Sequence, residues 1–305
     1  MGLQQNLNDI QTNLLAAKTA IAQSISNKGV ECSADDQLSS FAEKIDSITT
    51  GSTGGTGDKI MLTNGTKFGY SKAFEPELYD VSQVTDMSFM FNNSSGLTDL
   101  DLSTWDVSNV NTFYSMFVST DLTSINLSNW NTRKCTNMAS MFQSNKKLSG
   151  ALDLSSFDVA NVADMNNMFN YSYNITEIKG IETWNTMLLC DASDMFNSLI
   201  NITRLDLSGW KFNSLINTSQ MFNFMTGMTE LYINGWGYNE ECTSLDLSSC
   251  SALTKNSILY IFNGLFDRAT AGYTTQHTIA LAPETKALLS DDNIAIATNK
   301  GFTVV

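Results

Sequence analysis

The chain has 305 residues, with 17 Lys and Arg, 31 Asp and Glu and a single histidine, His277, for a formal net charge of −14. So acidic a chain lacks the basic surface that neutralises phosphates, which argues against nucleic acid as a partner. One histidine leaves little material for acid–base, triad or zinc chemistry. We therefore expect a neutral-polar surface on a protein that is not an enzyme, with no catalytic residue, metal site or cofactor.

A heptad pattern runs through the first residues. Apolar side chains alternate in steps of four and three, which predicts a coiled coil, and Leu at a with Ile at d favours a trimer or tetramer over a dimer. A second amphipathic helix is predicted to begin at Ser33. Residues 1–48 are thus expected to form a helical, coiled-coil-like stalk for oligomerisation or attachment. Its seam comprises Leu3, Leu7, Ile10, Leu14, Ala17 and Ile21.

Two short segments separate this stalk from the rest. Residues 49–59 are rich in Gly, Ser and Thr, as expected of a flexible linker. Residues 60–72 contain Asn64-Gly65 between two β-prone runs, Ile60–Thr63 and Thr66–Tyr70. Asn-Gly is a strong signal for a tight hairpin turn, so we predict a hairpin that caps the first repeat.

Residues 73–248 are an internal repeat. Six Met-Phe pairs recur at spacings of 26, 25, 27, 27 and 26 residues, and an aromatic residue lies 12 positions before each Phe. The repeated Phe and Met are predicted to be core, and Cys135, in a position usually held by Val, a small buried side chain. The Phe residues are Phe91, Phe117, Phe142, Phe169, Phe196 and Phe222, and the aromatics are Tyr79, Trp105, Trp130, Phe157, Trp184 and Trp210.

Each repeat is predicted to hold one strand and one short helix. Leu100 and Leu102 alternate with polar residues, which indicates a strand with one buried face. Val110, Phe113 and Phe117 stand at i, i+3 and i+7, a helical spacing. Neither element buries its apolar face alone, so we expect the units to stack into an α/β solenoid of the leucine-rich-repeat type, with about 26 residues per unit.

One polar position of the predicted strand recurs in five units. Stacked side chains about 4.8 Å apart would form a ladder able to hold calcium or to hydrogen-bond a glycan. A solvated strand face, interrupted by Lys179 and Tyr232, explains the same pattern and is the interpretation we favour. The candidate ligand face comprises Asp101, Asn126, Asp153, Asp206 and Asp246.

Residues 249–305 depart from the repeat and are expected to form a C-terminal cap. The pattern already fails after Trp236, where Glu241 and Ser248 hold the positions of the small apolar residue and the Phe. The segment Asn256–Leu265 predicts an amphipathic helix, residues 284–301 a second one and residues 302–305 a strand. His277 is expected to be structural, and a disulfide between Cys242 and Cys250 is not favoured.

The repeat resembles a known family. The run from Trp105 to Val110, Trp-Asp-Val-Ser-Asn-Val, followed by Met116-Phe117 and the Leu-x-x-Leu-Asp-Leu-Ser segment, is similar to the BspA-like leucine-rich repeat of bacterial surface proteins and mycoplasma lipoproteins. The resemblance covers residues 73–248 and implies a solenoid used for recognition or adhesion. It names no ligand, because such repeats are a scaffold.

The two ends resemble other proteins. Residues 14–48 are similar to segments of phage tail and fibre proteins, and the C-terminal cap is similar to the ends of repeat proteins of gut Bacteroidales and their phages. These resemblances imply a module that docks on other virion proteins through residues 1–48 and carries a recognition body.

Two functional hypotheses follow. The sequence has no secretory signal, no apolar run of membrane-spanning length and an odd five cysteines without a C-x-x-C motif. We therefore expect a phage head or tail fibre that assembles in the host cytoplasm, forms a homotrimer and attaches the virion to a host-surface glycan or protein. The alternative is a bacterial cell-surface leucine-rich-repeat adhesin, and a glycan-cleaving fibre is a weaker third hypothesis.

Overall fold

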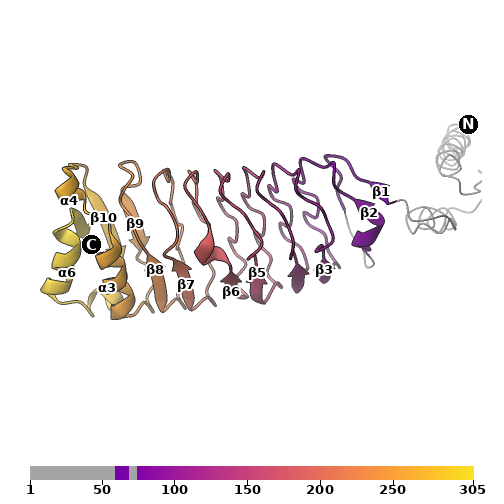
Figure 1. The fold of residues 1–305 in the computed structure, drawn as a ribbon. Helices are drawn as coiled ribbons and strands as arrows, with labels where there is room; N and C mark the ends of the chain where they lie inside the picture. The colour runs from indigo at the N-terminus through magenta and orange to yellow at the C-terminus, as the bar shows by residue number, and fades with distance from the viewer. Residues whose placement is uncertain (1–58, 69–73) are drawn as a thin grey trace, which may run out of the picture. The chain divides into compact units, whose positions relative to one another are not determined.

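The computed structural model describes residues 59–68 and 74–305 (Figure 1). The described residues fall into two units, one with residues 59–61 and 77–80, the other with residues 62–68, 74–76 and 81–305. In the first unit, β1 (Ile60–Met61) pairs in parallel with β2 (Tyr79–Asp80), which follows the 3-10 helix η1 (Pro76–Leu78). The predicted helical module of residues 1–48 lies outside the described residues.

Over residues 60–68, the described part of the hairpin predicted for residues 60–72, the two runs do not pair as strands. The Asn64-Gly65 turn is present, since Gly65 has a φ of 82° and the Thr66 N–H donates to the Thr63 carbonyl at 3.2 Å. After the turn, however, the Phe68 N–H donates to Met90 at 2.7 Å, in the first repeat. The backbone that a hairpin would pair with residues 60–63 is therefore bonded elsewhere, and β1 takes β2 as its parallel partner.

Short parallel strands occupy the predicted Leu-x-Leu positions. The alternation is confirmed, because Leu100 and Leu102 are buried while Asp99 and Asp101 are exposed. The strands pair as β3–β4, β5–β6 and β7–β8 and lie side by side in Figure 1. Their bounds are β3 Asp99–Asp101, β4 Ser124–Asn126, β5 Gly150–Asp153, β6 Ile175–Lys179, β7 Arg204–Leu207 and β8 Glu230–Ile233, with the 3-10 helix η2 (Ile181–Thr183) after β6.

The short helix predicted in each repeat is absent from the described repeats. The segment from Asn111 to Ser119 is instead a series of turns that bonds to the next repeat. The N–H groups of Phe113, Ser115, Phe117 and Ser119 donate to the carbonyls of Asn137, Ala139, Met141 and Gln143 at 2.9–3.0 Å. Isolated parallel bridges mark this contact at five successive junctions, from Asp86–Thr112 to Asp191–Asn217.

Backbone conformation explains why no helix forms. Two residues per repeat, 10 and 14 positions after the aromatic, have φ between 54° and 65°, where a helix requires about −63°. The i, i+3, i+7 spacing of apolar residues fits a series of turns as well as it fits a helix, because each turn also directs an apolar side chain into the core. The left-handed residues are Phe89, Asn93, Ser115, Ser119, Ser140, Ser144, Asn167, Tyr171, Asp194, Ser198, Gln220 and Phe224.

The repeated Phe side chains form one continuous stack inside the repeats. Neighbouring rings lie 5.4–6.0 Å apart between centroids and within 13° of parallel, and every ring is buried. The Met before each Phe is buried too, as is Cys135, so these core predictions are confirmed. Indole groups add links across junctions, since Trp130 Nε1 donates to the Leu102 carbonyl at 2.9 Å.

Helices and a three-stranded sheet follow the last repeat, at the yellow end of Figure 1. The sheet has the order β11–β10–β9, all parallel. The Ser257 hydroxyl bonds both the N–H and the C=O of Leu231, at 2.8 and 3.0 Å, and so occupies the edge of β8. The elements are β9 Ser244–Leu247, α3 Lys255–Gly264, α4 Arg268–Ala271, β10 His277–Leu281, α5 Pro283–Lys286, α6 Asp291–Thr298 and β11 Phe302–Val304.

The predictions for this end are confirmed in part. Helix α3 and strand β11 lie where the sequence places them. The single helix predicted over residues 284–301 is two, α5 and α6, because Ser290 starts a new helix. Its hydroxyl accepts the Asn293 N–H, and the Asn293 side chain accepts the Ser290 N–H. In the described part of the chain, no helix is long and apolar enough to cross a membrane.

Arg268 and His277 are buried together near the last sheet. The Arg268 guanidinium, 1% exposed, donates to the carbonyls of Gly237 and Thr275 at 2.6 and 3.1 Å and pairs with Glu240 at 3.1 Å. Both His277 nitrogens are buried without a hydrogen-bond partner. Burial, and then the charge of Arg268, lower the pKa of His277, so the folded protein holds this imidazole neutral.

We expect Phe142→Ala to destabilise the protein by about 3–5 kcal/mol, because it removes a buried ring between two stacked neighbours. Chemical denaturation measures the loss in the free energy of unfolding. Met187→Ala, at a side chain that is 53% exposed, is the control and should cost about 0.5 kcal/mol or less. Equal losses in the two variants would contradict the stacked core.

We also expect acid to destabilise the fold through His277. Its pKa is depressed in the folded state, so the unfolded chain binds the proton first as pH falls below about 6.5. The free energy of unfolding should therefore decrease from pH 7 to pH 5.5, and His277→Phe should reduce that decrease. Urea titrations at the two pH values measure it, and an unchanged pH dependence in the variant would show that His277 is not the cause.

Candidate functional site

The five residues of the predicted ligand face lie on strands but do not form one ladder. Asp101 and Asn126 are neighbours in register between β3 and β4. The other three face different partners, namely Lys179 for Asp153, Tyr232 for Asp206 and Ala280 for Asp246. The structure therefore brings together one predicted pair and distributes the remaining carboxylates over three separate sheets.

Each of these side chains stabilises its own turn. One side-chain oxygen accepts the backbone N–H of the Ser two residues later, as in an Asx turn. Hydrogen bonds from the Ser103 side chain and N–H lower the pKa of Asp101, and the Ser155 N–H does the same for Asp153. The distances are 2.9 Å for Asp101, 3.1 Å for Asn126, 3.0 Å for Asp153, 3.1 Å for Asp206 and 2.9 Å for Asp246.

An aromatic and charged cluster that includes Asp206 lies on strands β7 and β8 and helix α3. The Arg204 guanidinium lies 2.8 Å from Asp206 Oδ2 and 3.5 Å from Glu230 Oε2, and 4.9 Å above the centre of the Tyr232 ring. The Tyr232 hydroxyl donates to Glu230 at 3.1 Å, and this hydrogen bond raises the pKa of Tyr232. The Tyr232 and Tyr260 rings are in edge-to-face contact, with their centroids 4.9 Å apart. We call these five residues the Arg204 cluster.

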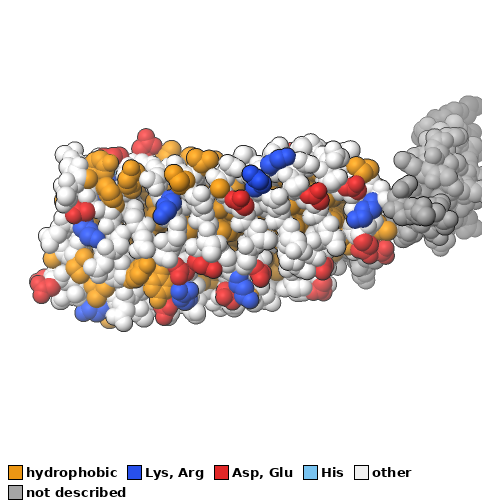
Figure 2. Space-filling view, viewed as in Figure 1, with side chains coloured by type: hydrophobic (Ala, Val, Ile, Leu, Met, Phe, Trp, Pro, Cys, Tyr) orange, Lys and Arg blue, Asp and Glu red, His pale blue; other side chains and the backbone are white. Residues whose placement is uncertain are grey.

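A polar pocket of 540 Å³ adjoins this cluster between β6 and β7. It is lined by side chains of both charges, among them Glu177, Lys179, Glu182 and Arg204. Charged side chains gather on this lower edge of the molecule in Figure 2. The two strands belong to different sheets, so their facing edges are not hydrogen-bonded to each other.

Sequence explains why the sheet is interrupted there. Where other repeats have Leu-Asp-Leu-Ser, this repeat reads Ile-Lys-Gly-Ile from Ile178 to Ile181. Gly180 has a φ of 88°, and a Cβ on it would lie 2.4 Å from the Ser155 Cα, so only glycine fits. The chain then enters η2, and Gly180, Ile181 and Glu182 line the pocket beside β7.

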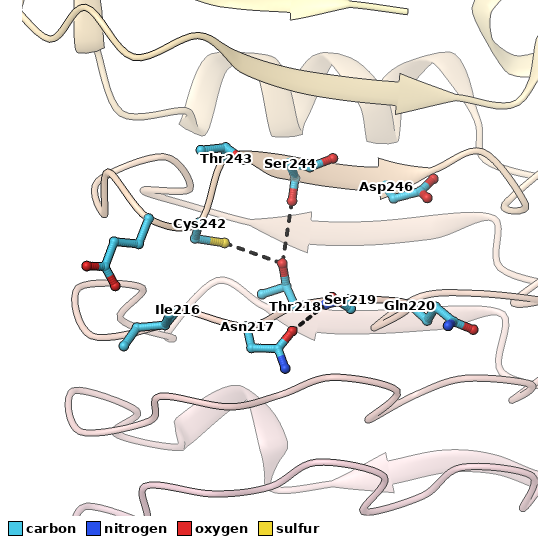
Figure 3. A pocket seen from close by; sticks show the side chains of 10 residues that line it. Ile216, Asn217, Thr218, Ser219, Gln220, Cys242, Thr243, Ser244 and Asp246 are labelled. Atoms are coloured by element: carbon cyan, nitrogen blue, oxygen red, sulfur yellow. Dashed lines mark hydrogen bonds between the residues drawn. The ribbon is translucent and has the colours of Figure 1, made fainter.

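A second cleft, of 390 Å³, lies where the repeat pattern ends (Figure 3). Residues 216–220 of the Trp210 repeat form one wall and residues 241–246 the other. Thr218 Oγ1 crosses the gap, 3.3 Å from Cys242 Sγ and 3.5 Å from the Ser244 carbonyl. Asp246, a predicted site residue, lines this cleft as Asp206 lines the first.

The described residues offer groups for non-covalent binding. Among them, no three His, Cys, Asp or Glu side chains are grouped as a metal site would require. Burial raises the pKa of Cys135 and of Cys250 to about 12, so both stay protonated, and all four described cysteines are unpaired. The arrangement favours hydrogen bonding and ring contacts with a bound molecule.

Two parts of the site differ from the sequence prediction. Arg204 and Glu230 were not predicted, although Arg204 precedes Asp206 by two residues on the same strand face, and that spacing is the signal that identifies it. Tyr232, which the ladder hypothesis treats as an interruption, is central to the Arg204 cluster. The predicted oligomerisation seam, Leu3, Leu7, Ile10, Leu14, Ala17 and Ile21, lies outside the described residues.

Because Asp153 accepts a backbone hydrogen bond in an Asx turn, we expect its replacement by Ala and by Asn to change the free energy of unfolding by different amounts. Asp153→Ala removes the acceptor of the Ser155 N–H and should lower the free energy of unfolding by about 0.5–1 kcal/mol. Asp153→Asn should cost much less, because Asn126 makes the same contact in its own repeat. Chemical denaturation separates the two, and an equal loss would mean that the charge, rather than the turn, is what matters.

Comparisons with known proteins give one family. Its model, described as a Mycoplasma protein of unknown function (DUF285), matches residues 60–153 and again residues 149–246. No curated protein and no solved structure matches the chain. The two consecutive matches cover more than half of the sequence and the repeats that carry both pockets, and they support a BspA-like repeat surface protein. The chain therefore belongs to the DUF285 family.

Proposed function

We propose that this protein is a surface adhesin, in which a leucine-rich-repeat-type solenoid presents a saccharide-binding face formed by the Arg204 cluster and the adjoining pocket. The observation that carries the proposal is the Arg204 cluster itself, a partly exposed group of aromatic, cationic and anionic side chains beside a polar pocket. The family match supports the surface role.

Backbone contacts support the solenoid. At five successive junctions, from the Tyr79 repeat to the Trp210 repeat, four N–H groups of one repeat are bonded to carbonyls of the next, at 2.7–3.1 Å. A unit of this kind contacts only its neighbours, which is the defining property of a solenoid. Such an array presents a long, regular surface on which a few variable residues determine what is bound.

The chemistry of the cluster suits a sugar. Saccharide hydroxyls both donate and accept hydrogen bonds, and the cluster supplies carboxylate acceptors on Asp206 and Glu230 beside guanidinium donors on Arg204. Tyr232 and Tyr260 add ring faces and edges for the C–H groups of a sugar. The pocket of 540 Å³ lies within the range of about 300–1,000 Å³ typical of ligand sites.

The family match favours the adhesin hypothesis over the phage fibre hypothesis. A virion role, a trimer and docking through residues 1–48 stay predictions from the N-terminal sequence. The proposed binding role needs no catalytic step, so we propose a protein that is not an enzyme. It also needs neither nucleic acid nor membrane insertion, and the partner we propose is a glycan of another cell surface.

Binding of the full chain to an array of bacterial and host glycans tests the proposal. We expect Tyr232→Ala and Arg204→Ala to weaken binding about tenfold or more, since each loses several contacts to a bound sugar. Tyr232→Phe should retain most of it, because it keeps the ring. Lys147→Ala, which alters an exposed cation paired with Asp121, is the matched control and should bind normally.

Two outcomes would overturn the proposal. One is undiminished glycan binding by both Ala variants, which would place the ligand elsewhere on the repeats. The other is an array on which no glycan is retained by the wild-type chain at micromolar concentration. Circular dichroism of each variant shows whether a loss of binding reflects a loss of fold.

A further inference from the structure

The last junction between repeats lacks backbone hydrogen bonds that the earlier ones have. In the preceding junction, the N–H groups of Ala192 and Asp194 donate to the carbonyls of Asn217 and Ser219, both at 2.9 Å. The equivalent N–H groups in the next repeat belong to Thr218 and Gln220. Within the described structure these two donate no hydrogen bond. They line the 390 Å³ cleft of Figure 3.

The sequence departs from the repeat at this junction. Glu241 stands where other repeats have a small apolar residue, so the chain that follows cannot pack inward in the same way. The next segment, β9, is hydrogen-bonded to β10 on its other edge. Side chains hold the junction instead, since the Ser249 hydroxyl accepts the Phe224 N–H and donates to Asn223 Oδ1, both at 3.0 Å.

The cleft therefore combines free donors with acceptors. Backbone N–H groups with no partner in the protein are available to an acceptor from outside the chain. Across the cleft stand Glu241 and Asp246, and one Asp246 oxygen already accepts the Ser248 N–H, which leaves the other for a ligand. The lining residues include two carboxylates and no Lys or Arg. The local charge therefore opposes a carboxylate or phosphate ligand.

We propose that this cleft is a second binding site, specific for an uncharged sugar. Hydroxyl oxygens of the sugar accept from the N–H groups of Thr218 and Gln220, and its hydroxyl protons are donated to Glu241 and Asp246. Ile216, half exposed at the rim, offers an apolar contact for the C–H face of the ring. Nothing in this proposal depends on the Arg204 cluster, which shares no lining residue with the cleft.

Amide spectra of the 15N-labelled full chain test the proposal directly. The probes are the methyl glycosides of glucose, galactose, mannose and N-acetylglucosamine, with glucuronic acid as the charged comparison. We expect at least one neutral sugar to shift the Thr218 and Gln220 amide signals and to slow their hydrogen exchange, and glucuronic acid to do neither. The proposal is overturned if no sugar shifts these amides, or if glucuronic acid binds as well as the neutral sugars.

Matched variants identify the acceptors. Asp246→Asn keeps the turn to Ser248, as Asn126 does in its repeat, but removes the charge. With Glu241→Gln added, the neutral sugar should bind about tenfold more weakly and the discrimination against glucuronic acid should decrease. Asp153→Asn, the same substitution at a residue in neither pocket, is the control. An equal effect from the control would contradict the site.

The proposals for the two sites can be tested independently of each other. Tyr232→Ala should leave the amide shifts at Thr218 and Gln220 intact while it weakens binding on the glycan array. Loss of both effects in that variant would overturn the separation of the two sites.

Discussion

Backbone hydrogen bonds between consecutive repeats are the interaction on which the second unit depends. Each repeat contains short strands and turns that bury little by themselves, and only some N–H groups of its turns, such as that of Met116, are bonded within the repeat. Alternate N–H groups from Phe113 to Ser119 are bonded to the next repeat, and this pattern recurs at five junctions. The same spacing places the Phe rings 5.4–6.0 Å apart, so hydrogen bonding and ring stacking impose one common period on the chain.

That common period made much of the fold predictable. The constant separation of 12 residues between the aromatic and the Phe identified the core, because both ends of the interval are buried in every repeat from Trp105 onward. The helix assigned to the same interval was wrong because the positions of apolar residues alone do not separate a helix from inward-facing turns. What distinguishes the turns from a helix is the left-handed backbone conformation at residues such as Ser115 and Ser119. A Ser residue predicts that conformation only weakly.

Pairings with distant residues were less predictable. Asn64-Gly65 forms the expected turn, but β1 pairs with residues 79–80. That partner is too distant in the sequence for a local motif to predict it. For the candidate site, sequence identified Asp206 and Asp246 because they share a repeat position. Their pockets arise from features outside that position, Gly180 in one case and Glu241 in the other, and the effect of each depends on what the neighbouring repeat does.

Both pockets lie at positions where the sequence departs from the repeat pattern. A regular junction satisfies its own backbone groups, so its turns offer no free backbone donors to another molecule. The pocket beside β7 is lined by Gly180 and η2, where the sequence leaves its Leu-x-Leu pattern, and the cleft beside Thr218 is lined by Glu241, which replaces an apolar residue of the repeat. In a protein of stacked repeats, binding sites are therefore expected where the sequence departs from its own consensus. Uniform repeats supply the rigidity that holds such a departure in place.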